Sequence, residues 1–96
     1  MRIEVLQKAK RDLLAAREFY DSQEQGLGNY FSDVMASEID ALAWYAGIHV
    51  RYQGYYKAIT RKFPYSIYYK VSGEVVKIYA VLDNRRNPAM IADRLA

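Results

Sequence analysis

The sequence predicts an α+β fold: an N-terminal strand and an antiparallel helical hairpin pack on a small antiparallel β-meander, followed by a short C-terminal helical tail. The hydrophobic period supports this, because apolar residues recur every three or four positions in the first half and every second position later. Length supports it too, because 96 residues that are 52% hydrophobic suffice for one modest core. We therefore expect one domain spanning residues 1–96.

The first element is a short strand at the N-terminus. Ile3 and Val5 alternate with Arg2 and Glu4, which indicates a strand with one buried face.

Two helices follow the strand. The first is expected over residues 7–25, where apolar residues recur at helical spacing: Leu6, Ala9, Leu13, Ala16 and Tyr20. Gly26-Leu27-Gly28 should break it, and a second helix is expected from Asn29 to a stop near Gly47. Its apolar stripe contains Phe31, Val34, Met35, Ile39, Leu42 and Tyr45. So short a turn makes the helices antiparallel, and their joint apolar stripe needs a partner surface.

A meander supplies that surface. Three segments are rich in tyrosine, valine and isoleucine: Tyr55–Phe63, Tyr65–Val71 and Val75–Leu82. Ser72-Gly73 marks a tight turn between the last two, and Pro64 marks a strand junction or edge because proline cannot donate to a ladder.

Two-residue alternation predicts the two faces of this meander. The face toward the helices is expected to hold Ile67, Tyr69, Val71, Val76, Ile78, Ala80 and Leu82. The other face is expected to expose lysines among tyrosines, namely Tyr68, Lys70, Lys77 and Tyr79.

Charge is distributed unevenly along the chain. Residues 1–47 contain five Lys/Arg and eight Asp/Glu, whereas residues 48–96 contain nine and three, so the halves carry about minus three and plus six. The basic half ends its last strand in Arg85-Arg86-Asn87-Pro88. This asymmetry indicates an anionic partner, either nucleic acid or an acidic protein, and charge alone does not separate the two.

The composition excludes several classes of site. Without cysteine there is no disulfide, thiolate metal site or cysteine nucleophile, and the lone histidine, His49, is expected to be exposed and incidental. We expect no metal and no cofactor. With no signal pattern and no apolar run of about twenty residues, we expect no membrane segment and a cytoplasmic protein.

Several sequence segments carry a resemblance to a known family. They are Ala16-Arg17-Glu18-Phe19-Tyr20, Gly26-Leu27-Gly28, Arg61-Lys62-Phe63-Pro64-Tyr65-Ser66-Ile67-Tyr68-Tyr69 and Ala80-Val81-Leu82-Asp83-Asn84-Arg85-Arg86-Asn87-Pro88. From about residue 3 to residue 90 the chain resembles the RelE/ParE superfamily of bacterial type II toxins, known from plasmid stabilisation systems. The resemblance implies a growth-arresting toxin that is silenced by an acidic antitoxin. The two proteins would form a toxin–antitoxin hetero-oligomer.

The branch resembling RelE implies a ribosome-dependent endoribonuclease that cleaves messenger RNA. That chemistry needs a proton acceptor, cations for the developing phosphate charge and an acid for the leaving oxygen. Lys57, Arg85 and Arg86 are the candidate cations. Ser66 stands where such ribonucleases tend to carry arginine, and Asp83 stands where relatives often carry histidine, which counts against this branch.

The branch resembling ParE implies a toxin that is not an enzyme and binds DNA gyrase, and we favour it. The residues predicted to bind the target or the antitoxin are Lys57, Arg61, Lys62, Tyr68, Lys70, Lys77, Tyr79, Arg85 and Arg86, because aromatic and arginine side chains commonly anchor interfaces. Two alternatives stay open: a non-toxic remnant that only binds antitoxin, and an arginine pair that is a solvated strand end neutralised by Asp83 or by the C-terminal carboxylate.

Overall fold

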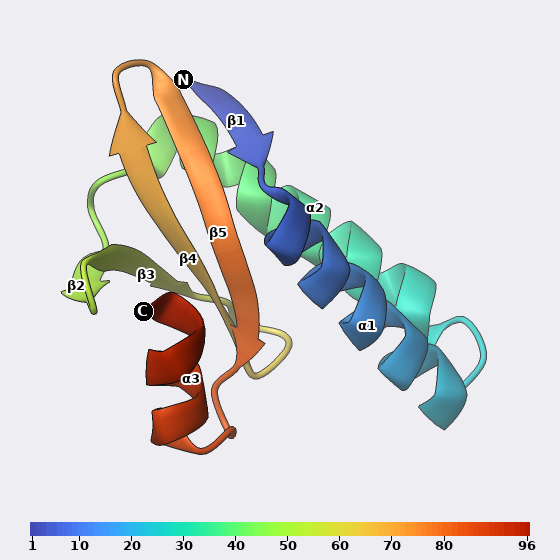
Figure 1. Cartoon of the computed structure of the whole chain (residues 1–96). Coiled ribbons are helices and arrows are strands. Elements are labelled where there is room, and N and C mark those ends of the chain that lie inside the picture. The colour runs from blue at the N-terminus through green and yellow to red at the C-terminus, as the bar shows by residue number, and fades with distance from the viewer.

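A computed structural model describes residues 1–96 and confirms the α+β class (Figure 1). The elements in chain order are β1 (Arg2–Val5), α1 (Gln7–Gln23), α2 (Leu27–Tyr45), β2 (Val50–Tyr52), β3 (Tyr55–Ile59), β4 (Tyr65–Ser72), β5 (Val75–Asp83) and α3 (Pro88–Leu95). The strands form one five-stranded sheet in the order β1-β5-β4-β3-β2. The α1–α2 hairpin covers one face, and α3 covers part of the other.

The sheet is mixed, because β1 pairs in parallel with β5, a strand far from it in sequence. β2 to β5 pair antiparallel as a meander, whereas β1 pairs with β5 in parallel, with Arg2 opposite Val75 and Val5 opposite Ile78. The α1–α2 hairpin lies between β1 and the meander in sequence, which gives the chain enough length to return for a parallel pairing.

The two helices of the hairpin approach closely at Gly28. The expected break at Gly26-Leu27-Gly28 is wrong for Leu27 and Gly28, because the second helix already begins at Leu27. Of the three, Gly26 alone lies outside the helix, in a left-handed conformation with φ 92°. A Cβ on Gly28 would lie 2.6 Å from the carbonyl oxygen of Arg17, so glycine permits this helix contact. Asp21 accepts hydrogen bonds from the backbone N–H groups of Gly26 and Gly28, at 3.0 and 3.2 Å.

A second hairpin, β2–β3, was not predicted. Its turn residues Gln53 and Gly54 both have positive φ, 53° and 85°, as a two-residue type I′ turn requires. The strand after it ends at Ile59 rather than Phe63, because the chain turns there into Pro64. The buried Thr60 hydroxyl lies 3.0 Å from the carbonyl oxygen of Phe63 and holds this turn.

The predicted apolar face of the last strand is wrong in its second half. The ladder pairs Tyr68 with Ala80 but Tyr69 with Ile78, so Tyr79 is an extra residue in a β-bulge. The bulge reverses the alternation. Val76 and Ile78 pack with the helical hairpin, whereas Ala80 and Leu82 belong to a second cluster on the opposite face.

Helix α3 builds that second cluster. Ile91 and Leu95 pack on Tyr68, Ala80 and Leu82. Asn87 caps the helix by accepting from the backbone N–H of Ala89 at 2.8 Å, and Pro88 occupies the first turn, where a missing N–H costs nothing. Tyr68 is therefore 0% exposed, and the expectation that it lies on an open surface is wrong.

An ion pair connects the two helical layers around the edge of the sheet. Beyond Ile78 the strand β5 has no β1 neighbour, and Asp12 of α1 accepts the N–H of Val81 there at 3.0 Å. Arg94 of α3 donates to both oxygens of the same carboxylate, at 2.6 and 2.7 Å. We call this arrangement the Asp12–Arg94 clasp.

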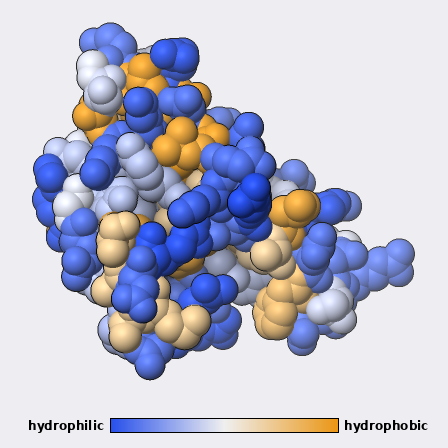
Figure 2. Space-filling view, in the orientation of Figure 1, coloured by the Kyte–Doolittle hydropathy of each residue, from blue (hydrophilic) through white to orange (hydrophobic).

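The surface is mostly hydrophilic, with apolar groups at the top of the view near β1 and further ones on α1 and α3 (Figure 2). The large exposed apolar residues of these two helices are Leu14, Phe19 and Met90. None of the helices combines the length and apolar character that crossing a bilayer requires. No group of three His, Cys, Asp or Glu residues is placed to hold a metal ion.

Candidate functional site

A set of lysines and tyrosines lies on the sheet face that points away from α1 and α2, beside α3. We call it the tyrosine–lysine face, and its members are Tyr52, Tyr55, Lys57, Lys70, Lys77 and Tyr79. The Lys70 ammonium lies 4.6 Å from the centre of the Tyr55 ring and 5.5 Å from that of Tyr79, and these two rings meet edge to face at 5.2 Å. The Lys57 ammonium lies 5.3 Å from the Tyr52 ring. Two of the three lysines of this face, Lys57 and Lys70, thus contact aromatic rings.

The charge on this face is not neutralised. Lys70 and Lys77 are direct cross-strand partners, an arrangement of like charges that destabilises a sheet. Glu4 of β1 is the other cross-strand neighbour of Lys77 but forms no ion pair with it. Since both ion pairs of the chain lie elsewhere, this face retains positive charge for an anionic partner.

Sequence reasoning missed Tyr52 and Tyr55. They flank the Gln53-Gly54 turn, and they are cross-strand partners in the unpredicted β2–β3 hairpin. The signal that could have found them is a glycine-containing two-residue turn between residues of high strand propensity.

The remaining predicted residues do not join this face. Arg61 and Lys62 lie in the loop after β3, where Lys62 is 5.8 Å from the ring of Tyr30 on α2. Arg85 and Arg86 lie at the end of β5 on the side of α1, so the sequence-predicted site separates into three groups.

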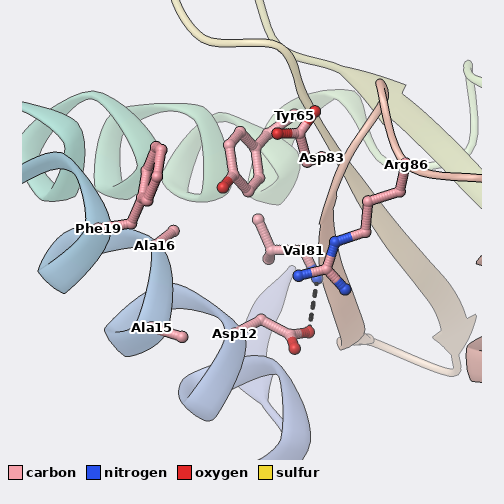
Figure 3. Close-up of a pocket in the computed structure, with 8 residues that line it drawn as sticks. All are labelled: Asp12, Ala15, Ala16, Phe19, Tyr65, Val81, Asp83 and Arg86. Atoms are coloured by element: carbon pink, nitrogen blue, oxygen red, sulfur yellow. Dashed lines mark hydrogen bonds between the residues drawn. The ribbon is translucent and has the colours of Figure 1, made fainter.

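A recess lies between α1 and the end of β5, beyond the last residue of β1. Its volume is about 270 Å³, and its lining residues are Asp12, Ala15, Ala16, Phe19, Tyr65, Val81, Asp83 and Arg86 (Figure 3). Arg86 extends from the loop after β5 toward α1, and no ion pair holds its guanidinium.

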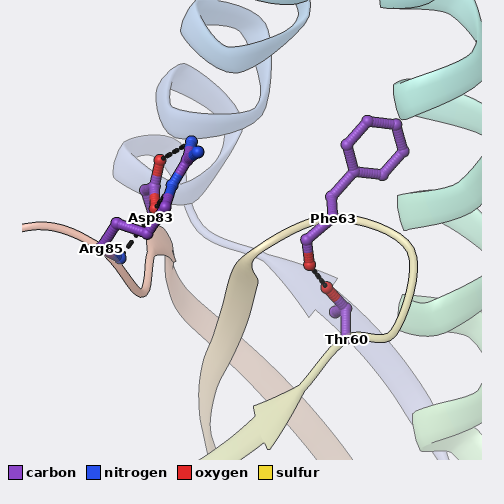
Figure 4. Close-up of polar contacts among 4 residues, drawn as sticks. All are labelled: Thr60, Phe63, Asp83 and Arg85. Carbon is purple, nitrogen blue, oxygen red and sulfur yellow. Dashed lines mark hydrogen bonds and ion pairs between the residues drawn. The ribbon is translucent and has the colours of Figure 1, made fainter.

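Arg85 differs from Arg86 because it is already paired. Its Nε and Nη2 donate to the two oxygens of Asp83 at 3.0 and 2.7 Å, and its backbone N–H donates to Oδ1 at 2.8 Å (Figure 4). These bonds to Arg85 hold the pKa of the Asp83 carboxyl below its ordinary value, against the opposing effect of burial. The alternative in which Asp83 neutralises the strand end therefore applies to Arg85 alone.

The lone histidine is not incidental. His49 is half-buried, and its Nδ1 lies 2.6 Å from the hydroxyl of Tyr69, which accepts the backbone N–H of Gly47 at 2.9 Å. Nδ1 and the Tyr69 hydroxyl therefore share one hydrogen bond, and Nδ1 can accept the phenol proton only when the imidazole is neutral. Burial lowers the pKa of His49 below 6.5, although Glu38 opposes the shift.

We expect the free energy of unfolding to fall as the pH drops below about 6.5. Unfolded chains then bind a proton that folded chains resist, so the contribution of His49 is fully present above pH 6.5 and is lost as the pH falls toward the lowered pKa. Urea unfolding at pH 7 and pH 5.5 measures this, with His49→Gln expected to lose part of the pH dependence. An NMR titration midpoint above 6.5 for this imidazole would contradict the assignment.

Comparison with protein-family models and with curated proteins finds no match. Among solved structures, the chain is similar to one from the chromosomal ParDE toxin–antitoxin system of P. aeruginosa, with a TM-score of 0.77 and 19% sequence identity. The alignment covers 84% of this chain and 92% of that chain. The chain therefore has a ParE-like fold, as its sequence resemblance predicted.

Proposed function

We propose that this chain is the toxin of a type II toxin–antitoxin system, that an acidic antitoxin neutralises it, and that it acts by binding a target such as DNA gyrase. The observation that carries the proposal is the tyrosine–lysine face. There Lys57 and Lys70 lie over tyrosine rings, and neither they nor Lys77 forms an ion pair. Ordered aromatic rings with unneutralised cations suit an interface with a large anionic partner.

The separation of the cationic groups favours binding over catalysis. A ribonuclease of the RelE type would need Lys57, Arg85 and Arg86 to converge on one phosphate. Lys57 lies on the tyrosine–lysine face, whereas Arg86 lines the recess beside α1 and Arg85 is paired with Asp83. His49, the only histidine, bonds to Tyr69 on the helix side of the sheet.

One observation keeps the ribonuclease as a second candidate. A face of tyrosines and lysines also suits single-stranded RNA, because bases stack on aromatic rings while cations contact phosphates.

Expression of the chain alone in a bacterium distinguishes these functions. Under our proposal growth stops, cells filament and a DNA-damage response appears, while purified gyrase accumulates cleaved DNA in the presence of the protein. Rapid arrest of translation with cut transcripts would instead establish the ribonuclease. Normal growth at a verified protein level would leave only a module that binds antitoxin. Co-expression of the proposed acidic antitoxin should restore growth.

A further inference from the structure

We propose that the recess between α1 and β5 binds an apolar side chain of an acidic peptide, whose neighbouring carboxylate pairs with Arg86. The inference rests on the proposed function, because we take this peptide to be a segment of the antitoxin.

The shape and lining of the recess suit one apolar side chain. Ala15 and Ala16 of α1 leave the space open, and Val81 lines it from the sheet. Phe19 lies at its border and is 50% exposed, which is unusual for a phenylalanine without a partner. The volume of about 270 Å³ lies just below the range of about 300–1,000 Å³ that small-molecule sites occupy, so a single side chain fits better than a free ligand.

One cation at the recess has no ionic partner within the chain. Its two carboxylates are both neutralised, Asp12 by Arg94 at 2.6 Å and Asp83 by Arg85 at 2.7 Å. Arg86 is the remaining charged residue of the lining, and no carboxylate of the chain pairs with it. A guanidinium beside an apolar surface is well suited to a peptide carboxylate, because its planar fork can donate two parallel hydrogen bonds.

The lining also favours a peptide over nucleic acid. Most of the lining is apolar and only Arg86 offers an unpaired cation, which suits one apolar side chain beside one carboxylate rather than a chain of successive phosphates. Tyr65 contributes a neutral hydroxyl, because a phenol has an ordinary pKa of about 10 and burial raises the pKa of this one further. Phe19 continues the apolar surface along α1, where an amphipathic segment can extend.

The first test uses a probe of defined chemistry on the full chain. We expect acetyl-Leu-Glu-Leu-Glu-amide to shift the NMR signals of Ala15, Ala16 and Val81, with a dissociation constant on the order of millimolar for so short a peptide. The glutamine analogue of the probe should bind at least about tenfold more weakly, because it lacks the carboxylate. Shifts located elsewhere, or equal binding of the two peptides, would overturn the proposal, as would an oligothymidylate that occupies the recess in place of the peptide.

Substitutions test the same contact. Arg86→Ala should weaken the probe at least about tenfold by removing its ionic partner, and Ala15→Leu should do so by filling the space. Arg11→Ala removes an exposed cation of α1 that forms no ion pair, and it should change binding by less than about twofold. Unchanged binding in both Arg86→Ala and Ala15→Leu would remove the recess as the site.

Growth assays and antitoxin binding to the same variants distinguish failure of this inference from failure of the proposed function. If the wild-type chain arrests growth and the antitoxin binds Arg86→Ala and Ala15→Leu as tightly as the wild type, the recess is not its seat although the chain is a toxin. If the wild-type chain neither arrests growth nor binds an acidic protein, the proposed function fails and the antitoxin is excluded as the occupant.

Discussion

Replacing Lys57 and Lys70 together by glutamate is expected to abolish growth arrest while the protein stays folded. Both lysines are ordered by tyrosine rings on the tyrosine–lysine face, so charge reversal should weaken target binding through two central contacts. Such contacts are worth about 2 kcal/mol or more each when an interface buries them, which corresponds to a loss of at least two orders of magnitude in affinity. Colony counts after induction and a binding assay with purified gyrase measure the effect.

Stability should change little in this variant. Losing the cation–π contact costs about 0.5–1 kcal/mol for exposed Lys70 and more for half-buried Lys57, while a carboxylate at position 70 opposite Lys77 replaces a like-charge pair by an opposite-charge pair. The matched control is Lys8→Glu with Lys10→Glu, which makes the same change in net charge on exposed positions of α1. Full toxicity in the Lys57/Lys70 variant, or equal loss in the control, would remove this face as the docking surface.

The alternation of residues along β4 predicted the exposed lysine side of the sheet, because an antiparallel strand with one buried face repeats every two residues. It failed for Tyr68 because α3, twenty residues further along the chain, covers that part of the face. It failed for Ala80 and Leu82 because a bulge depends on the pairing with β4, which no local pattern encodes. The hairpin and the meander were predictable from local patterns, whereas the two-sided core was not.

The arginine pair illustrates the same limit for the candidate site. Asp83 and Arg85 are two residues apart, so their pairing was one of the alternatives that the sequence left open. Nothing local distinguishes Arg86 from Arg85. The difference arises because Arg86 lines the recess formed with α1, more than sixty residues earlier in the chain. Residues that act together here come from separate elements, and only the fold brings them to one place.

Removing the Asp12 carboxylate, in Asp12→Ala, is expected to cause the largest loss of stability among these substitutions. The side chain accepts from the N–H of Val81 and from both terminal nitrogens of Arg94, so its loss leaves a strand donor and a guanidinium without partners. The Asp12 and Arg94 side chains are 13% and 26% exposed, which places the pair between a surface and a buried ion pair. We expect a loss of about 2–4 kcal/mol in the free energy of unfolding.

That loss is a large share of the about 5–15 kcal/mol that holds a domain together, and it should lower Tm by about 10–20 °C. Arg94→Ala should cost less, because Asp12 then still accepts from Val81, and Glu18→Ala on α1 should change stability by less than about 0.5 kcal/mol because Glu18 is exposed and unpaired. Urea unfolding of the three variants should therefore show losses in the free energy of unfolding that decrease in the order Asp12→Ala, Arg94→Ala, Glu18→Ala. If Arg94→Ala costs as much as Asp12→Ala, the ion pair and not the bond to Val81 stabilises the edge of β5. If neither costs more than Glu18→Ala, the clasp does not hold α3 to the sheet, and α3 is free to leave the second core cluster.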